Sequence, residues 1–356
     1  MSIKPAFLST GIGSMPFTDP DYAVSVSLTR LGAPIWPQLP KLGMNEQMEI
    51  QYSEGMPAAV IDRDKGRMYF NTAGDYSESF AAFYENYLAA MDPDSGDGDC
   101  SAMAISPEFS RGLQALEKRL QAEGVKRPFL KVQTTGPCSF ALTLVDENKR
   151  AIYYNDEFRD MIVKTLAMKC RWQIRKFQPF AENIICFVDE PILSAFGSST
   201  YVSVKREDVV ALLGEVIEAV HLDNGIAGVH CCGNTEWSLL IDAGVDIVNF
   251  DAFGFGETIA MYGNAVRKHL ERGGVLAWGI VPTSTAIRDQ TVDSLAAHLE
   301  KMMDNLAAQG IAKKLIAEQA MITPSCGTGS MDPADAEKVF ATTQALSAAM
   351  KARYGF

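Results

Sequence analysis

Short apolar segments alternate with longer amphipathic segments along most of the chain. The apolar segments are rich in Val, Ile and Leu, and each one ends in a polar or glycine-containing turn. Short apolar runs bounded by such turns predict buried strands, whereas apolar positions recurring every three or four residues predict helices. Eight strands are expected, at residues 7–14, 34–39, 129–135, 184–189, 226–232, 246–251, 275–281 and 320–325.

Helices are predicted between these strands, at residues 157–177, 206–222, 236–243, 257–272 and 292–308 among others. Strands that alternate with helices predict parallel strands joined by helical crossovers. Eight such units predict an α/β protein of one closed (β/α)8 TIM barrel. The chain has no low-complexity tract and no Gly/Ser linker, so residues 1–356 are expected to form a single catalytic domain.

One excursion, at about residues 45–106, interrupts the alternation after the second strand. Residues 58–61 and 67–70 flank a polar turn that contains Gly66, which predicts a β-hairpin. Residues 77–91 then predict a helix. The acidic residues 92–99 resemble a calcium-binding loop, but no Glu stands twelve places after the first Asp, so we expect a solvated loop.

The composition excludes several classes of protein. Hydrophobic residues make up 47% and charged residues 21% of the chain, as in ordinary globular proteins. A net charge of −12 argues against nucleic-acid binding. The chain has no apolar run of about 18 residues, so no membrane span is predicted. The first residues do not form a hydrophobic signal segment. The seven cysteines lack the close spacing of a disulfide scaffold, which favours the reducing cytoplasm.

The most informative motif is His230-Cys231-Cys232 at the end of one predicted strand, together with Cys326 at the end of the last. One imidazole and two thiolates form an incomplete tetrahedral zinc set, and catalytic zinc sites keep a position open for water or substrate. His230 and Cys232 share one face of a strand because alternate side chains point the same way. The alternative is that cysteine acts as a small buried hydrophobe, and we interpret the other cysteines in that way: Cys100, Cys138, Cys170, Cys186 and Cys231.

Polar residues end nearly all of the predicted strands. Among them are Ser14, Asp189, His230, Asp251 and Cys326. Active sites of TIM barrels lie at the carboxyl ends of the strands. The sequence therefore predicts one site that is surrounded by the loops after the strands.

Five motifs occur in the order found in the catalytic barrel of cobalamin-independent methionine synthase, which the chain resembles over nearly its whole length. They are Ile12-Gly-Ser-Met-Pro16, Thr135-Gly-Pro137, Val188-Asp-Glu-Pro191, His230-x-Cys232 and Pro324-Ser-Cys-Gly327. The continuation of the fourth motif to Thr235 is similar to zinc methyltransferases that take methyl groups from corrinoids. Those enzymes belong to the wider uroporphyrinogen decarboxylase-like superfamily, which shares the barrel.

The resemblance implies that His230, Cys232 and Cys326 bind Zn²⁺. The family's further ligand is a glutamate, and Asp251 stands in its place. Alternatively, Asp251 contacts a zinc ligand without binding the metal itself, or it caps a helix. By the same resemblance Ser14 and Asp189 hold the carboxylate and ammonium groups of an amino-acid substrate. The family's other substrate-binding glutamate falls near Glu46. Glu190 could equally be a structural partner within the barrel instead of a substrate-binding residue.

The implied activity is zinc-dependent methyl transfer to a thiol, with homocysteine as the small-molecule substrate and methionine as the product. Zinc deprotonates a bound thiol, and the thiolate is the nucleophile. Folate-using synthases have two barrels and a Trp shortly after Gly-Pro. This chain has length for one barrel and no Trp after Gly136-Pro137, although Phe140 is a possible substitute. The resemblance is therefore to the short core form, for which a methylated corrinoid protein is the expected donor.

Three other hypotheses stay open at this stage. A methylcobamide-dependent enzyme acting on another thiol would not need Asp189 as an ammonium site. A non-catalytic zinc-binding or corrinoid-binding accessory protein would not need Ser14, Asp189 and the zinc set around one cavity. A decarboxylase of the superfamily would need no metal, and a zinc hydrolase is disfavoured because the chain has no His-Glu-x-x-His helix.

Overall fold

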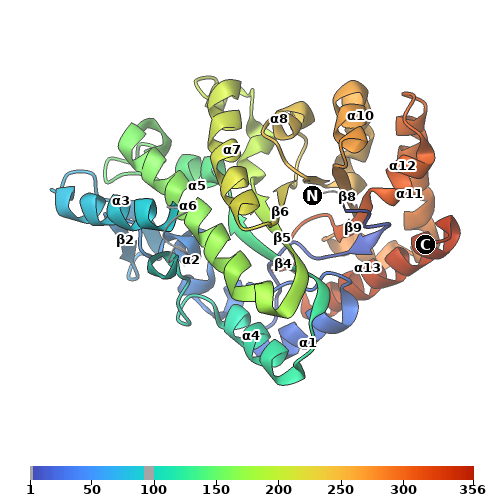
Figure 1. Cartoon of the computed structure of the whole chain (residues 1–356), viewed down its shortest axis with the longest axis horizontal. Coiled ribbons are helices and arrows are strands. Elements are labelled where there is room, and N and C mark those ends of the chain that lie inside the picture. The colour runs from blue at the N-terminus through green and yellow to red at the C-terminus, as the bar shows by residue number, and fades with distance from the viewer. Residues whose placement is uncertain (1–2, 92–99) are drawn as a thin grey trace.

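Seven parallel strands curl around a central core in the computed structural model, which describes residues 3–91 and 100–356 (Figure 1). Their order in the sheet is β1-β9-β8-β7-β6-β5-β4. All of their pairings are parallel, so the predicted TIM-barrel-like α/β fold is confirmed. The strands are β1 Leu8–Ser9, β4 Arg127–Thr135, β5 Ala181–Asp189, β6 Ile226–Cys231, β7 Ile247–Phe250, β8 Val275–Val281 and β9 Ala320–Pro324.

The eighth position of the barrel is taken by residues 33–38, which form isolated bridges on both sides. Parallel bridges join Thr10 to Ala33 and Ile35 to Lys131. The Ala33 N–H donates to the Ser9 carbonyl at 2.8 Å. These residues therefore connect the β1 side of the sheet to β4 and close the curl.

The prediction of a regular strand at residues 34–39 is wrong in one respect, because the segment forms only these bridges. Pro34 and Pro37 interrupt it. Proline has no backbone N–H, so it removes the donors on which a regular ladder depends.

Inside the barrel, side chains change from apolar to polar along the strands. An apolar cluster fills the end at which the strands begin, and it includes Ile185, Ile226 and Ile247. Four residues further along β5 and β6, on the same faces, stand Asp189 and His230. The apolar end fixes the sheet, and the polar end leaves the carboxyl ends of the strands available for chemistry.

Helices cover the outside of the sheet (Figure 1). Most of the predicted helices are present, but the one expected at 257–272 is divided into a 3-10 helix, Gly256–Tyr262, and α10. The poor helix former Gly263 stands at the junction. The helices are α1 Pro20–Arg30, α2 Met48–Ser53, α3 Ser77–Met91, α4 Arg111–Glu123, α5 Pro137–Thr143, α6 Asp156–Phe177, α7 Arg206–Leu222, α8 Trp237–Asp242, α9 Ala252–Phe255, α10 Gly263–Glu271, α11 Val292–Ala307, α12 Lys313–Glu318 and α13 Pro333–Tyr354.

The excursion at about residues 45–106, which follows residues 33–38 in the sequence, contains the predicted hairpin and helix. Strands β2 Ala59–Asp62 and β3 Arg67–Phe70 pair antiparallel, and α3 lies on the outer side of α6 (Figure 1). The acidic residues 92–99, expected to form a solvated loop, lie outside the described residues.

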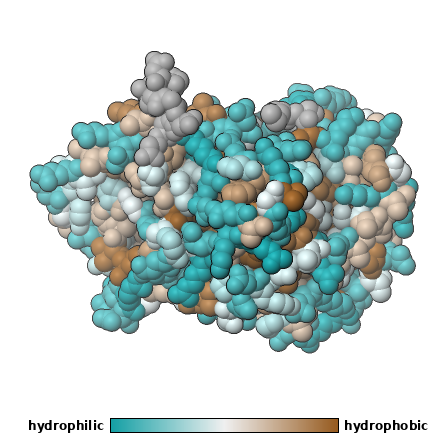
Figure 2. Space-filling model, turned by 60° about the horizontal axis from the view of Figure 1, so that its bottom comes forward, coloured by the Kyte–Doolittle hydropathy of each residue, from teal (hydrophilic) through white to brown (hydrophobic). Residues whose placement is uncertain are grey.

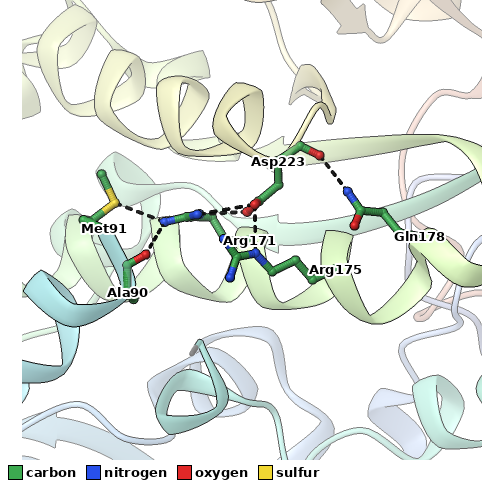
Figure 3. Close-up of polar contacts among 6 residues, drawn as sticks. All are labelled: Ala90, Met91, Arg171, Arg175, Gln178 and Asp223. Atoms are coloured by element: carbon green, nitrogen blue, oxygen red, sulfur yellow. Dashed lines mark hydrogen bonds and ion pairs between the residues drawn. The ribbon is translucent and has the colours of Figure 1, made fainter. Parts of the chain in front are cut away.

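A buried ion-pair network fastens α3 to the barrel helices (Figure 3). Arg171 of α6 donates from Nε and Nη2 to the two carboxylate oxygens of Asp223, at 2.7 and 3.3 Å, just beyond the end of α7. Its Nη1 donates to the Ala90 carbonyl in the last turn of α3, at 2.8 Å. A bidentate pair of this kind fixes geometry as well as charge, so α3, α6 and α7 are held together.

The surface drawn in Figure 2 is mostly hydrophilic, with hydrophobic residues scattered among the polar ones. Isolated apolar residues are normal on a protein surface. None of the helices within residues 3–91 and 100–356 combines the length and apolar character needed to cross a membrane.

The close approach of α4 to residues 33–38 gives a testable prediction. A Cβ at Gly112 would lie 1.9 Å from the Pro37 carbonyl oxygen, whereas a Cβ at Gly214, inside α7, would have its nearest neighbour at 3.9 Å. Gly112→Ala should lower the free energy of unfolding by about 1–3 kcal/mol through overpacking. Gly214→Ala should raise it by about 0.5–1 kcal/mol because alanine favours a helix interior. Urea unfolding measures both, and shifts of the same sign would contradict the packing of α4 described above.

Candidate metal centre

Three side chains with metal-binding atoms meet where β6 and β9 end. His230 lies in β6, Cys232 follows it, and Cys326 follows β9. Their ligand atoms all lie within 4.8 Å of one another. The three residues line a cavity of about 590 Å³. The structure thus brings together the three side chains that the sequence singled out, in an arrangement that could hold a metal ion.

The strand geometry separates Cys232 from its neighbour Cys231. Cys231 is fully buried and packs in the main hydrophobic core outside the cavity, where its Sγ contacts the Gly233 carbonyl at 3.6 Å. His230 and Cys232 both line the cavity. Alternation along the chain at the end of β6 therefore places His230 and Cys232 on the cavity side and Cys231 in the core, as predicted.

The two ring nitrogens of His230 have different surroundings. Nδ1 lies 2.6 Å from Oδ1 of Asn249, which belongs to β7. Nε2 is buried and has no hydrogen-bond partner among the described residues. Sequence reasoning did not single out Asn249. The available signal was a polar residue in the middle of a buried apolar strand.

The thiols of Cys232 and Cys326 lie close enough to affect each other's ionisation. The neighbouring Cys326 thiol is the chief cause that lowers the pKa of Cys232. The hydrogen bond to Cys232, together with burial, raises the pKa of Cys326. A lowered pKa favours the thiolate form of Cys232, which is the form of cysteine that binds metals.

The three predicted substrate-binding residues line the same cavity. Oδ1 of Asp189 is buried without a hydrogen-bond partner among the described residues. Burial raises the pKa of Asp189 to about 6, against the effects of Lys131 and His230. Glu46 is buried and accepts the Arg111 N–H at 3.0 Å, and the Ser14 Oγ accepts the Gly329 N–H at 3.2 Å. Their binding of a substrate stays a prediction.

Asp251 has a different environment from the three grouped residues. Its Oδ1 accepts the Gly254 N–H at 2.8 Å and caps α9. Its pKa is raised, chiefly by burial and also by the nearby Cys232. Within the described part of the chain, the metal-binding group consists of His230, Cys232 and Cys326. The helix-capping interpretation of Asp251 thus describes its contacts, and metal ligation by Asp251 stays a prediction.

Glu190 faces away from the cavity and stabilises the start of α5. Its Oε1 accepts the Cys138 N–H at 2.9 Å, and its Oε2 accepts the N–H and the hydroxyl of Ser139, each at 2.7 Å. A Cβ at Gly136 would lie 2.1 Å from the Glu190 Cδ, so glycine is needed where the carboxylate passes. These contacts support the structural interpretation of Glu190.

Comparison with known proteins supports the fold. No protein-family model and no curated protein sequence matched the chain. A solved methyltransferase from Methanosarcina mazei superposes with a TM-score of 0.55 at 15% identity, covering 97% of this chain and 93% of that one. A 3-keto-D-glucoside 4-epimerase from E. coli gives a TM-score of 0.37 at 8% identity, with 65% and 82% covered. At these identities, the similarity concerns the fold alone.

Proposed function

We propose that the chain is a zinc-dependent methyltransferase that transfers a methyl group to the sulfur of homocysteine and produces methionine. The observation that carries the proposal is one cavity in which an imidazole, two thiols and two buried carboxylates converge. The similarity in fold to a methyltransferase supports it. The half-buried thiols of such a site are best preserved in the reducing cytoplasm.

The donor set suits zinc in particular. Two cysteine sulfurs and one imidazole nitrogen are the usual ligands of zinc, and an oxygen-seeking cation would select carboxylates instead. His230 offers an unpartnered Nε2, and the neighbouring Cys326 thiol lowers the pKa of Cys232. Zinc, when bound, supplies a positive charge that favours the deprotonated form of a thiol substrate.

The cavity also contains groups that match the other end of an amino-acid thiol. Asp189 lines the cavity, and its Oδ1 is buried without a hydrogen-bond partner among the described residues; a buried polar group without a partner is unfavourable. An ammonium group would provide that partner, and Glu46 lines the same cavity. Ser14, beside the glycine-containing loop after Cys326, is proposed to contact the substrate carboxylate.

The surroundings of the cavity favour a corrinoid over a folate as the methyl donor. No aromatic residue of the described chain lines the cavity. Phe140, the one candidate to stack on a pterin, is fully buried and packs against Phe70 with ring centroids 6.3 Å apart. A methylated corrinoid protein would instead carry its methyl group to the cavity mouth.

In the proposed reaction the homocysteine thiol releases its proton to solvent water, and its sulfur attacks the methyl carbon. The sulfur–carbon bond forms as the cobalt–carbon bond breaks, and the electron pair stays on cobalt. Asp189 and Ser14 hold the amino-acid end, so the sulfur is directed toward the methyl group. Correct positioning of two reactants can contribute several kcal/mol to such a step.

The first prediction from this proposal concerns metal content. Purified protein should contain one zinc per chain, measured by plasma mass spectrometry. Cys232→Ser and Cys326→Ser should each lose most of it, because each removes a soft ligand. Cys231→Ala is the matched control, since this neighbouring cysteine packs outside the cavity, and it should keep its zinc. Equal zinc loss in the control and the ligand variants would exclude this ligand set.

The second prediction concerns Asp189. Asp189→Asn should raise the KM for homocysteine roughly 10- to 100-fold, which corresponds to the loss of about 1–3 kcal/mol from a charged hydrogen bond. Zinc content should not change. The control is a thiol of the same length that lacks the amino group, whose KM should be the same for both proteins. An equal rise of KM for both thiols would show that Asp189 does not bind the ammonium group.

The third prediction concerns the donor. With homocysteine present, methylcobalamin or a methylated corrinoid protein should support methionine formation, whereas methyl-tetrahydrofolate should support little or none. Steady-state assays with each donor measure this difference. Turnover with the folate alone would refute the corrinoid donor. Turnover with corrinoid only when another thiol replaces homocysteine would favour the alternative enzyme, and no turnover in a zinc-loaded protein would favour an accessory role.

A further inference from the structure

The amide of Asn249 has only one orientation that fits its surroundings. Its Nδ2 lies 2.8 Å from the carbonyl oxygen of Ala277 and 2.9 Å from the hydroxyl of Thr323. A backbone carbonyl can only accept a hydrogen bond. The amide nitrogen must therefore face Ala277, and the amide oxygen must face the opposite side, toward His230.

This orientation decides which nitrogen of His230 carries the hydrogen. The Asn249 oxygen lies 2.6 Å from Nδ1 of the imidazole, and an amide oxygen can only accept. Nδ1 must then be the donor. A neutral imidazole has a single N–H, so Nε2 keeps its lone pair. That atom is the one that is buried without a partner beside Cys232 and Cys326.

We propose that Asn249 is a positioning residue that holds His230 as the Nδ1–H tautomer, with Nε2 directed at the metal position before any metal binds. Histidine ligands generally donate their second N–H to a neighbouring group, which sets the tautomer and the ring direction. The metal-related part of this inference rests on the proposed function. The tautomer itself follows from hydrogen bonds within the protein and does not depend on a metal.

The position of Asn249 in the sheet makes the orientation rigid. Asn249, Ala277 and Thr323 lie in β7, β8 and β9, and all three are fully buried. Solvent therefore does not compete for the amide. An aspartate at this position could still accept from His230 but could not donate to Ala277, and it would add a buried charge. A neutral side chain with one acceptor and two donors satisfies all three neighbours.

The test uses the metal-free full-length protein labelled with ¹⁵N-histidine. The chain has four histidines, so the ring nitrogens can be resolved by NMR and those of His230 assigned with His230→Gln. The parent should show the Nδ1–H tautomer at His230. Asn249→Leu keeps the approximate shape without the acceptor, and it should shift His230 toward the Nε2–H form. Its zinc affinity, measured by competition with a chromogenic chelator, should fall about 10- to 100-fold.

Two further variants separate positioning from packing. Thr323→Val removes one of the two acceptors for the Asn249 amide but leaves the Ala277 carbonyl, so the tautomer and the zinc affinity should stay those of the parent. Asn249→Asp keeps the acceptor and should keep the Nδ1–H form. This variant and the parent spectrum decide the question if Asn249→Leu does not fold.

Some outcomes would overturn the proposal. An Nε2–H tautomer in the parent, or an unchanged tautomer and zinc affinity in folded Asn249→Leu, would show that Asn249 does not position His230. A parent protein that holds the Nδ1–H tautomer and yet binds no zinc would confirm the tautomer assignment and refute the proposed function. The two inferences can thus fail separately.

Discussion

The register between β5, β6 and β7 is the constraint on which the whole site depends. Asp189 pairs with His230, and His230 pairs with Asn249, so three polar side chains form one row across the sheet. A shift of one residue in either pairing would turn every side chain of a strand to the other face. The apolar residues that begin these strands prevent such a shift, because they would have to leave the buried interior cluster. Packing at one end of the barrel thus fixes the chemistry at the other end.

Asp189 and Glu190 show how strand alternation gives two adjacent carboxylates different roles. Asp189 faces the cavity with one oxygen unpartnered among the described residues. Glu190 turns outward and accepts three hydrogen bonds at the start of α5. Burial raises the pKa of both groups, to about 6 and about 7. Their free hydrogen-bonding capacity, and not their pKa values, therefore distinguishes a candidate binding group from a structural one.

The features that were predictable from the sequence are those that follow from local patterns. Strands are present at seven of the eight expected places, although the one expected at residues 7–14 is only Leu8–Ser9. The grouping of His230, Cys232 and Cys326 follows from alternation and from the common edge of parallel strands. The irregular segment at residues 33–38 deviates because its prolines remove donors. This irregularity could have been predicted, since both prolines are visible in the sequence.

Other features depend on contacts between distant parts of the chain. Asn249 meets His230, Ala277 and Thr323, which come from three other strands, so its partners are known only once the register of the sheet is known. The capping of α9 by Asp251 depends on the direction in which the chain turns after β7. A strand-end carboxylate can serve as a cap or as a ligand, and its position in the sequence does not separate the two.

The composition of the cavity implies a division of labour between this chain and its proposed partner. The cavity has several fixed polar groups: the hydrogen-bonded His230, the two neighbouring thiols and two buried carboxylates. The lining offers no aromatic surface from the described chain on which a flat cofactor could stack. Aromatic stacking supplies binding energy and also fixes the orientation of a ring. If the proposed function holds, the orientation of the methyl donor would therefore have to be set outside this chain, while the barrel would orient the sulfur that receives the methyl group.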